Sequence, residues 1–190
     1  NDTGVQLTKR GIDTYVVLDG KNIVDDSISY VLDTESRGLS EEAAYDRLKS
    51  QLKDIFKRDF DMVYKKVDST LRGNITSELK AIDEEYKPDL IIFSPAFPDS
   101  KRTTVDGIHY VNGTRIKETE FAKDPIKPVR EDNIQKLIEL GYLEKVIHHR
   151  LEEIRGGSID LDLGRIHTFD AEDNADLEKI VTSIMKVDKK

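Results

Sequence analysis

Ten residues near the middle of the chain, 65–74 (KKVDSTLRGN), carry many groups that bind small anions. They combine two ammonium groups, a guanidinium, a carboxylate and two hydroxyls, and a helical pattern follows Asn74. The first turn of a helix offers unpaired N–H donors and a partial positive charge. Arg72 adds a planar fork that matches a carboxylate or a phosphate, and Gly73 could bring the backbone close to a ligand or take a positive φ. The segment therefore predicts a site for a compact anion.

The same residue types also build ordinary turns. Asp68, Ser69 and Thr70 could simply reverse the chain, Asn74 could cap the helix, and Arg72 could lie in solvent. Spacing alone does not favour either interpretation.

Two further segments fall where strands lead into loops. Residues 94–98 (SPAFP) run on to 101–107, which bring two more cations, Lys101 and Arg102. Prolines after a strand usually only end it, so the structural interpretation is favoured there, and residues 1–4 (NDTG) could merely cap a helix. His109 lies on an expected hairpin strand, and we interpret it as a packed or surface residue rather than a base.

Composition narrows the function classes. The 190 residues hold 30 Lys and Arg against 38 Asp and Glu, and the net charge of −8 is the wrong sign for binding a nucleic-acid backbone. The chain has no Cys, and its four His lack metal-ligand spacing, so no metal site is expected. Residues 90–93, the longest apolar run, cannot span a membrane, and no signal peptide is recognisable, so we expect a cytoplasmic protein.

Strands and helices alternate along the first half of the chain. The runs 14–18, 29–33, 60–64 and 89–94 are typical of buried parallel strands, and helices are expected after Ser40 and after Asn74. This predicts an α/β fold of three layers, with a mainly parallel sheet between helices. In such sheets ligands bind beyond the carboxyl ends of the strands, which is where residues 65–74 lie.

The second half predicts a small antiparallel excursion. Asn112-Gly113 between two short strands is the signal of a two-residue hairpin turn. We expect no second domain within residues 1–190, and the Gly156-Gly157 pair could be a mobile loop. The other elements expected here are a helix over 131–140, strands at 144–149 and 165–169, and a closing amphipathic helix over 173–187.

Several longer motifs, taken in order, resemble one known family. They are 1–6 (NDTGVQ), 32–37 (LDTESR), 65–74 (KKVDSTLRGN), 94–98 (SPAFP), 102–107 (RTTVDG), 111–113 (VNG) and 118–125 (ETEFAKDP). The succession resembles the four-carbon acid sugar kinases, which include D-threonate, D-erythronate and 3-oxo-tetronate kinases. The resemblance extends over almost the whole sequence, except that residues 140–165 match the family least.

The resemblance implies a kinase whose amino-terminal domain holds a small sugar acid and whose carboxyl-terminal domain brings ATP with Mg²⁺. Residues 1–190 look like the amino-terminal domain alone, without its first strand, whose aspartates rank as equal candidates for a catalytic role. The family also leaves homodimerisation open, and the sequence does not say which acid or which hydroxyl is used.

Carried over by position, the resemblance implies a set of site residues. Arg72 would pair with the substrate carboxylate through two hydrogen bonds, and Asp68 would orient or deprotonate the terminal hydroxyl as the candidate catalytic residue. Alternation along the chain lets only one of Lys65 and Lys66 reach the site, and Lys66 is the candidate. The substrate-binding set is Lys66, Asp68, Ser69, Arg72, Gly73, Asn74, Arg102 and Thr103.

Two other function classes stay open at this point. The same domain could be a stand-alone, non-catalytic module that binds a sugar acid. A dinucleotide-dependent oxidoreductase shares the fold class, but the sequence lacks any Gly-x-Gly-x-x-Gly.

Overall fold

The computed structural model describes residues 2–18, 23, 28–58, 60 and 62–187. The chain forms two compact units, one of Asn1–Lys66 with Ser77–Lys87 and the other of Val67–Thr76 with Pro88–Lys190. Helix α3 (Ile75–Tyr86) contributes residues to both. In the part of the chain so described, no helix is both long and apolar enough to cross a lipid bilayer.

The first unit is built on two parallel strands. β1 (Thr14–Val17) pairs in parallel with β2 (Ser29–Leu32), and helix α1 (Asp2–Lys9) precedes them. Helix α2 (Glu41–Ile55) starts as expected, because the Ser40 Oγ accepts a hydrogen bond from the Ala43 N–H at 3.2 Å. Its apolar stripe is buried against β1 and α3 in a cluster that includes Val17, Leu48, Leu52, Ile55 and Ala81.

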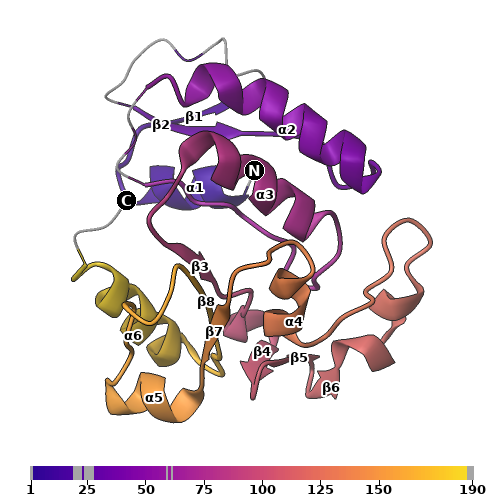
Figure 1. Ribbon diagram of the computed structural model, residues 1–190, viewed down its shortest axis with the longest axis vertical. Helices are drawn as coiled ribbons and strands as arrows, with labels where there is room; N and C mark the ends of the chain where they lie inside the picture. Colours follow the sequence, from indigo (N-terminus) through magenta and orange to yellow (C-terminus); the bar gives the residue numbers. More distant parts are fainter. Residues whose placement is uncertain (1, 19–22, 24–27, 59, 61, 188–190) are drawn as a thin grey trace. The chain divides into compact units, whose positions relative to one another are not determined.

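The second unit holds a three-stranded parallel sheet in the order β3-β8-β7, formed by Ile91–Phe93, Ile166–Phe169 and Val146–His149. The central strand β8 is buried along its whole length, as expected for a parallel sheet covered on both faces. Helices α5 (Leu151–Gly156) and α6 (Asn174–Ile184) lie on one side and α4 (Ile134–Glu139) on the other (Figure 1). The predicted layers and parallel strands are therefore present, but the parallel strands are divided between two sheets.

The antiparallel excursion has three strands, β4 (Arg102–Val105), β5 (Ile108–Val111) and β6 (Thr114–Arg115). The predicted Asn112-Gly113 turn is confirmed, with φ of 51° and 78°. A second turn of the same kind, Asp106-Gly107 with φ of 51° and 75°, joins β4 to β5 and was not predicted. Short 3₁₀ helices occupy Pro98–Ser100, Ile116–Glu118 and Glu120–Lys123.

The strand expected over residues 60–64 is wrong. Residue 60 and residues 62–64 have no strand pairing, and residue 61 lies outside the described residues. The Phe60 carbonyl instead accepts a hydrogen bond from the Tyr86 hydroxyl at 3.0 Å, while the Phe60 ring packs edge-on against Phe56. Met62 and Tyr64 are 64% and 72% exposed, so this segment lacks the burial that holds a central strand.

Candidate functional site

The loop that leads into α3 is a tight, polar turn in the second unit. The Asp68 Oδ1 accepts hydrogen bonds from the Thr70 N–H at 3.0 Å and from the Thr70 hydroxyl at 2.8 Å. Leu71 has a φ of 54° and Gly73 a φ of 105°, so two residues of this loop take left-handed conformations. This conformation is strained for Leu71. For Gly73 a positive φ is one of the two roles that the sequence predicts, the other being close approach of the backbone to a ligand.

Arg72 is held between two carboxylates. Its Nε donates to the Asp68 Oδ2 at 3.1 Å and to the Thr70 Oγ1 at 2.9 Å, and its Nη1 donates to the Asp124 Oδ2 at 3.0 Å. The guanidinium also lies over the Phe121 ring, 5.0 Å from the ring centre. Its side chain is 23% exposed, so it lies at the surface of the loop and not out in bulk solvent.

This arrangement limits how Arg72 can bind a further anion. A guanidinium can bind a carboxylate with two hydrogen bonds through either its Nε and Nη2 or its Nη1 and Nη2. Because Nε already donates to Asp68 and Nη1 to Asp124, two hydrogen bonds to a ligand would require one of these existing bonds to break. In the described part of the chain no residue accepts a hydrogen bond from its Nη2. Backbone N–H donors from Lys127 and Ile126, and then Arg72, lower the pKa of Asp124 to about 2, so this partner stays ionised.

Two other loop residues are fixed by side chains from distant parts of the second unit. Asn74 is buried, and its Oδ1 accepts a hydrogen bond from the Lys127 Nζ at 2.7 Å. The Ser69 carbonyl is 2.8 Å from the His109 Nε2. The loop is therefore anchored at Ser69, Arg72 and Asn74 by residues that follow it by 40 to 53 positions.

Arg102 and Thr103, the other two candidates in this unit, lie at the start of β4. The register pairs Thr103 with Tyr110 and Thr104 with His109. Because side chains alternate along a strand, Arg102 shares the face of Thr104, while Thr103 faces the opposite side. The structure thus associates Arg102 with the face on which His109 contacts the loop, and Thr103 with the other face.

The Arg102 guanidinium is only partly used by the fold. Its Nη1 donates to the Ser100 carbonyl, whereas its Nε is buried and has no hydrogen-bond partner among the described residues. The Oγ of Ser94, the residue that follows β3, is also buried and has no hydrogen-bond partner among the described residues. A buried donor without an acceptor costs free energy, so an acceptor supplied by a ligand would stabilise this region.

Lys66 belongs to the first unit. Lys66 is exposed, whereas the neighbouring Lys65 is ion-paired at 2.6 Å with Glu78, a buried residue of α3. The second Glu78 oxygen accepts a hydrogen bond from the Ser36 hydroxyl at 2.6 Å. Lys65 is therefore engaged within the first unit, and whether Lys66 binds a ligand stays a prediction.

Sequence reasoning missed the residues that hold the loop, above all His109, Asp124 and Lys127. His109 is fully buried. Of the two interpretations given above, the packed residue is therefore correct and the surface residue is wrong. A signal was available, because His109 and Val111 alternate with Ile108 and Tyr110 and share the buried face of β5. Asp124 and Lys127 carried no comparable signal.

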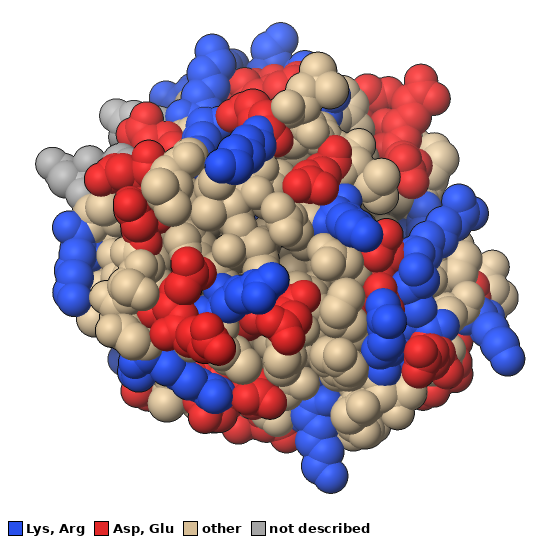
Figure 2. All heavy atoms as spheres, turned by 60° about the horizontal axis from the view of Figure 1, so that its bottom comes forward, with Lys and Arg blue, Asp and Glu red and all other residues tan. Residues whose placement is uncertain are grey.

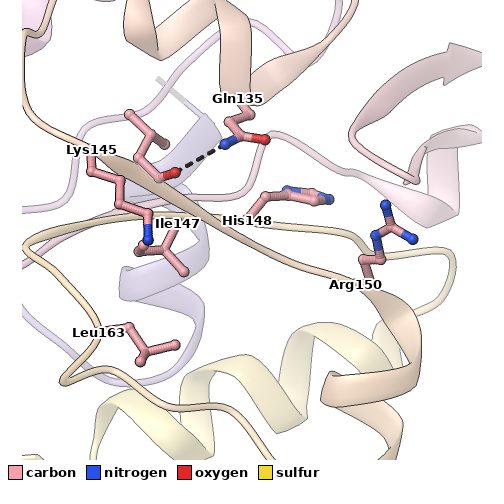
Figure 3. Close-up of a pocket in the computed structure, with 7 residues that line it drawn as sticks. Gln135, Lys145, Ile147, His148, Arg150 and Leu163 are labelled. Carbon is pink, nitrogen blue, oxygen red and sulfur yellow. Dashed lines mark hydrogen bonds between the residues drawn. The ribbon is translucent and has the colours of Figure 1, made fainter.

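A separate cavity of about 310 Å³ lies along β7 (Figure 3). Its lining includes a hydrogen bond of 2.9 Å from the Gln135 Nε2 to the Val146 carbonyl. The residues that line it are Gln135, Lys145, Val146, Ile147, His148, Arg150 and Leu163. None of them belongs to the predicted substrate-binding set.

Charge is mixed on the face shown in Figure 2, where Lys and Arg side chains are interspersed with Asp and Glu. This matches the acidic composition and means that a site for an anion must be made locally. Within the residues that the structure describes, no three His, Asp or Glu side chains gather closely enough to hold a metal ion.

The family model described as the sugar-binding N-terminal domain matches residues 1–190. The chain belongs to this family. It is 35% identical over 161 residues to the D-threonate kinase of Salmonella typhimurium, across 84% of this chain and 38% of that enzyme. It is 32% identical over 147 residues to the D-erythronate kinase of Heliobacterium modesticaldum, across 73% of this chain and 33% of that enzyme. This sugar-binding N-terminal domain therefore spans less than half the length of these relatives, and the resemblance predicted from its motifs is confirmed.

A solved structure from Bordetella bronchiseptica has the same fold as this sugar-binding N-terminal domain. The two superimpose with a TM-score of 0.80 at 28% identity, over 96% of this chain and 48% of the other. That protein is described as a domain of unknown function with bound citrate, in a domain-swapped dimer.

Proposed function

We propose that this chain is the sugar-acid-binding part of an ATP-dependent kinase that phosphorylates a four-carbon acid sugar such as threonate, erythronate or 3-oxo-tetronate. The observation that carries the proposal is the anchored loop at residues 68–74, which holds Arg72 and the start of α3 in place within an acidic protein. The D-threonate and D-erythronate kinases among the relatives support the substrate class. Citrate in the Bordetella structure supports a compact carboxylic acid as ligand.

The two arginines would bind the substrate carboxylate in this proposal, Arg72 through Nη2 and Arg102 through a guanidinium that the fold does not saturate. The Ser69 hydroxyl would bind a hydroxyl of the sugar acid, and Thr103, whose side chain faces the other side of β4 from Arg102, is the weaker candidate for such a contact. Gly73 and Asn74 would let the backbone at the start of α3 approach the ligand, and Lys66 would add charge.

Asp68 would act mainly by orienting the hydroxyl that attacks the phosphoryl group. Its carboxylate already accepts hydrogen bonds from the Thr70 N–H, the Thr70 hydroxyl and the Arg72 Nε, which favours an orienting role over proton abstraction. Phosphoryl transfer depends mostly on positioning and charge neutralisation, so a base is not essential.

We propose that ATP and Mg²⁺ bind mainly to a part of the enzyme outside these residues. The described residues offer no acidic cluster for the metal, and the sequence has no Gly-x-Gly-x-x-Gly for phosphates. Bound Mg²⁺ would neutralise charge that develops on the transferred phosphoryl group. The complete protein would be cytoplasmic, and the dimer of the Bordetella structure favours a homodimer, which analytical ultracentrifugation would test.

Thermal unfolding of the complete gene product with a panel of acids tests this function. Threonate, erythronate and their oxo forms are compared with succinate, a four-carbon acid without hydroxyls. A ligand that binds only the folded state at about 100 times its Kd adds about 2.7 kcal/mol of stability, so at least one sugar acid is expected to raise the Tm while succinate does not. Phosphorylation of that acid with ATP is then measured by mass spectrometry. A flat panel together with no phosphorylated product would refute the function.

A further inference from the structure

His109, in the middle of β5, is a buried residue with both ring nitrogens engaged. Its Nε2 is 2.8 Å from the Ser69 carbonyl, and its Nδ1 is 3.0 Å from the Thr104 hydroxyl. Its side chain has no exposed surface. A buried polar ring with a partner at each end has one fixed orientation, so both partners are tied to the same point.

The partners determine the tautomer. A carbonyl can only accept a hydrogen bond, so the Nε2 carries the proton and donates to Ser69. The Nδ1 then has a free lone pair and accepts from the Thr104 hydroxyl. Burial lowers the pKa of His109, and the nearby Arg102 charge acts in the same direction, so the neutral ring that this pattern requires is favoured.

Thr104, the residue that His109 contacts through its Nδ1, is hydrogen-bonded to the chain next to the parallel sheet. The Thr104 N–H and carbonyl exchange backbone hydrogen bonds with Ala171 at 2.9 and 3.0 Å, next to the end of β8. The Asp170 carboxylate, also buried, accepts the N–H groups of Asp106 and Gly107 at 2.8 and 2.9 Å. His109 therefore stands on a hairpin that is bound to the central strand of the parallel sheet.

The other contact of His109, through its Nε2, is with the strained loop. Fixing the Ser69 carbonyl also fixes the peptide that follows it, whose N–H belongs to Thr70 and points to the Asp68 carboxylate. Leu71, two residues further on, keeps its φ of 54° only because the surrounding contacts impose it. Without the His109 contact the loop loses one of its three anchors and the one that is closest to Asp68 and Ser69.

We propose that His109 is a positioning residue for the sugar-acid site: its Nε2–H holds the Ser69 carbonyl and so sets the loop that presents Ser69 and Arg72 to the substrate. This inference rests on the proposed function. It adds a residue that touches no substrate and that acts through the backbone of the loop.

Three variants of His109 in the complete gene product test the proposal. H109Q places an amide N–H where the Nε2 was, H109M keeps a similar length and volume without a donor, and H109N is too short to reach Ser69 but can still accept from Thr104. Loss of a net hydrogen bond is worth up to about tenfold in an equilibrium. We expect H109M and H109N to raise the KM for the acid about tenfold with kcat changed less, and H109Q to stay within about threefold of the parent.

Amide hydrogen exchange over residues 69–73 gives a second readout, independent of the substrate. Exchange should rise in H109M and H109N and stay near the parent rate in H109Q, while the exchange of α6 is unchanged in all three. H109Q is compared with H109M and H109N, or with the one of these two that folds. If they have equal KM values and equal amide exchange over residues 69–73, the proposed role of His109 is overturned. A parent protein that phosphorylates no sugar acid would instead overturn the proposed function, and the exchange data would still decide whether His109 holds the loop.

Discussion

Two arginines expected to bind the same carboxylate sit in opposite kinds of structure. Arg72 lies in an irregular, strained loop that side chains hold in place, and its charge is compensated by Asp68 and Asp124. Arg102 lies in a regular hairpin that backbone hydrogen bonds hold in place, and its Nε has no acceptor among the described residues. The difference suggests two tasks, because a compensated guanidinium maintains the shape of the loop, whereas the Arg102 guanidinium keeps a buried donor without an acceptor among the described residues.

Alanine at each position should separate these tasks most clearly. R72A and R102A should both weaken sugar-acid binding, since loss of a buried charge-assisted contact typically costs about 2–5 kcal/mol. R72A should also lower the Tm, because Asp68 and Asp124 lose their shared cation, while R102A should change the Tm little. Titration calorimetry and thermal unfolding of the complete gene product measure both effects. Catalytic efficiency and affinity unchanged in R72A would refute its assigned binding role.

Glycine positions give the next largest effect and test whether backbone geometry matters in both regions. Gly73 in the loop and Gly113 in the hairpin both have positive φ, at 105° and 78°. An Ala at either position should lower the free energy of unfolding by about 1 kcal/mol or more, because an L-residue does not fit that conformation easily. Only G73A should also weaken sugar-acid binding, with G113A as the matched control. Urea unfolding and calorimetry report the two quantities, and equal binding losses would contradict the distinction.

The hairpin shows how far sequence patterns reach. The sequence predicts the Asn112-Gly113 turn but not Asp106-Gly107, the same signal six residues earlier, because no strand is expected over residues 102–105. Both turns follow local rules that need no tertiary information. The Gly156-Gly157 pair, expected as a mobile loop, instead ends α5, with Gly157 in the left-handed cap position at a φ of 73°.

The loop shows where sequence patterns stop. The chemistry of residues 65–74 alone predicts a site there, and Gly73 has a positive φ, one of the two uses predicted for it. The ties from Asp124, Lys127 and His109 join residues 40 to 53 positions apart, and only the folded chain brings them together. Whether the eight predicted residues bind the substrate stays a prediction. The strand predicted over residues 60–64 is wrong for a related reason, because Phe60 packs against Phe56 while Met62 and Tyr64 are exposed.

Acid should weaken the loop's hold on Arg72 only at very low pH. The pKa of Asp124 is lowered from 3.8 to about 2. Its ionised form therefore contributes its full stabilisation of the folded state at pH values above 3.8, and this contribution is lost as the pH falls through about 2. D124N lacks the titration and should therefore be less stable than the parent at pH 6 but show a smaller decline between pH 4 and about 2. The carboxyl carbon shift of Asp124 in NMR gives the midpoint directly. A midpoint near 3.8 would mean that the loop does not hold this ion pair.

The smallest expected effect belongs to the hairpin side and appears at mildly acidic pH. Burial lowers the pKa of His109 and of His149 below 6.5, so the unfolded chain binds more protons than the folded one as the pH falls below that value. The free energy of unfolding should decrease from pH 7 toward pH 5 and level off above about pH 7. H109Q removes one of the two titrations, so its decline over this range should be shallower than that of the parent in urea unfolding. Parallel curves for the two proteins would show that His109 takes up a proton without loss of stability, and the hairpin would then hold Ser69 through a ring that tolerates either charge.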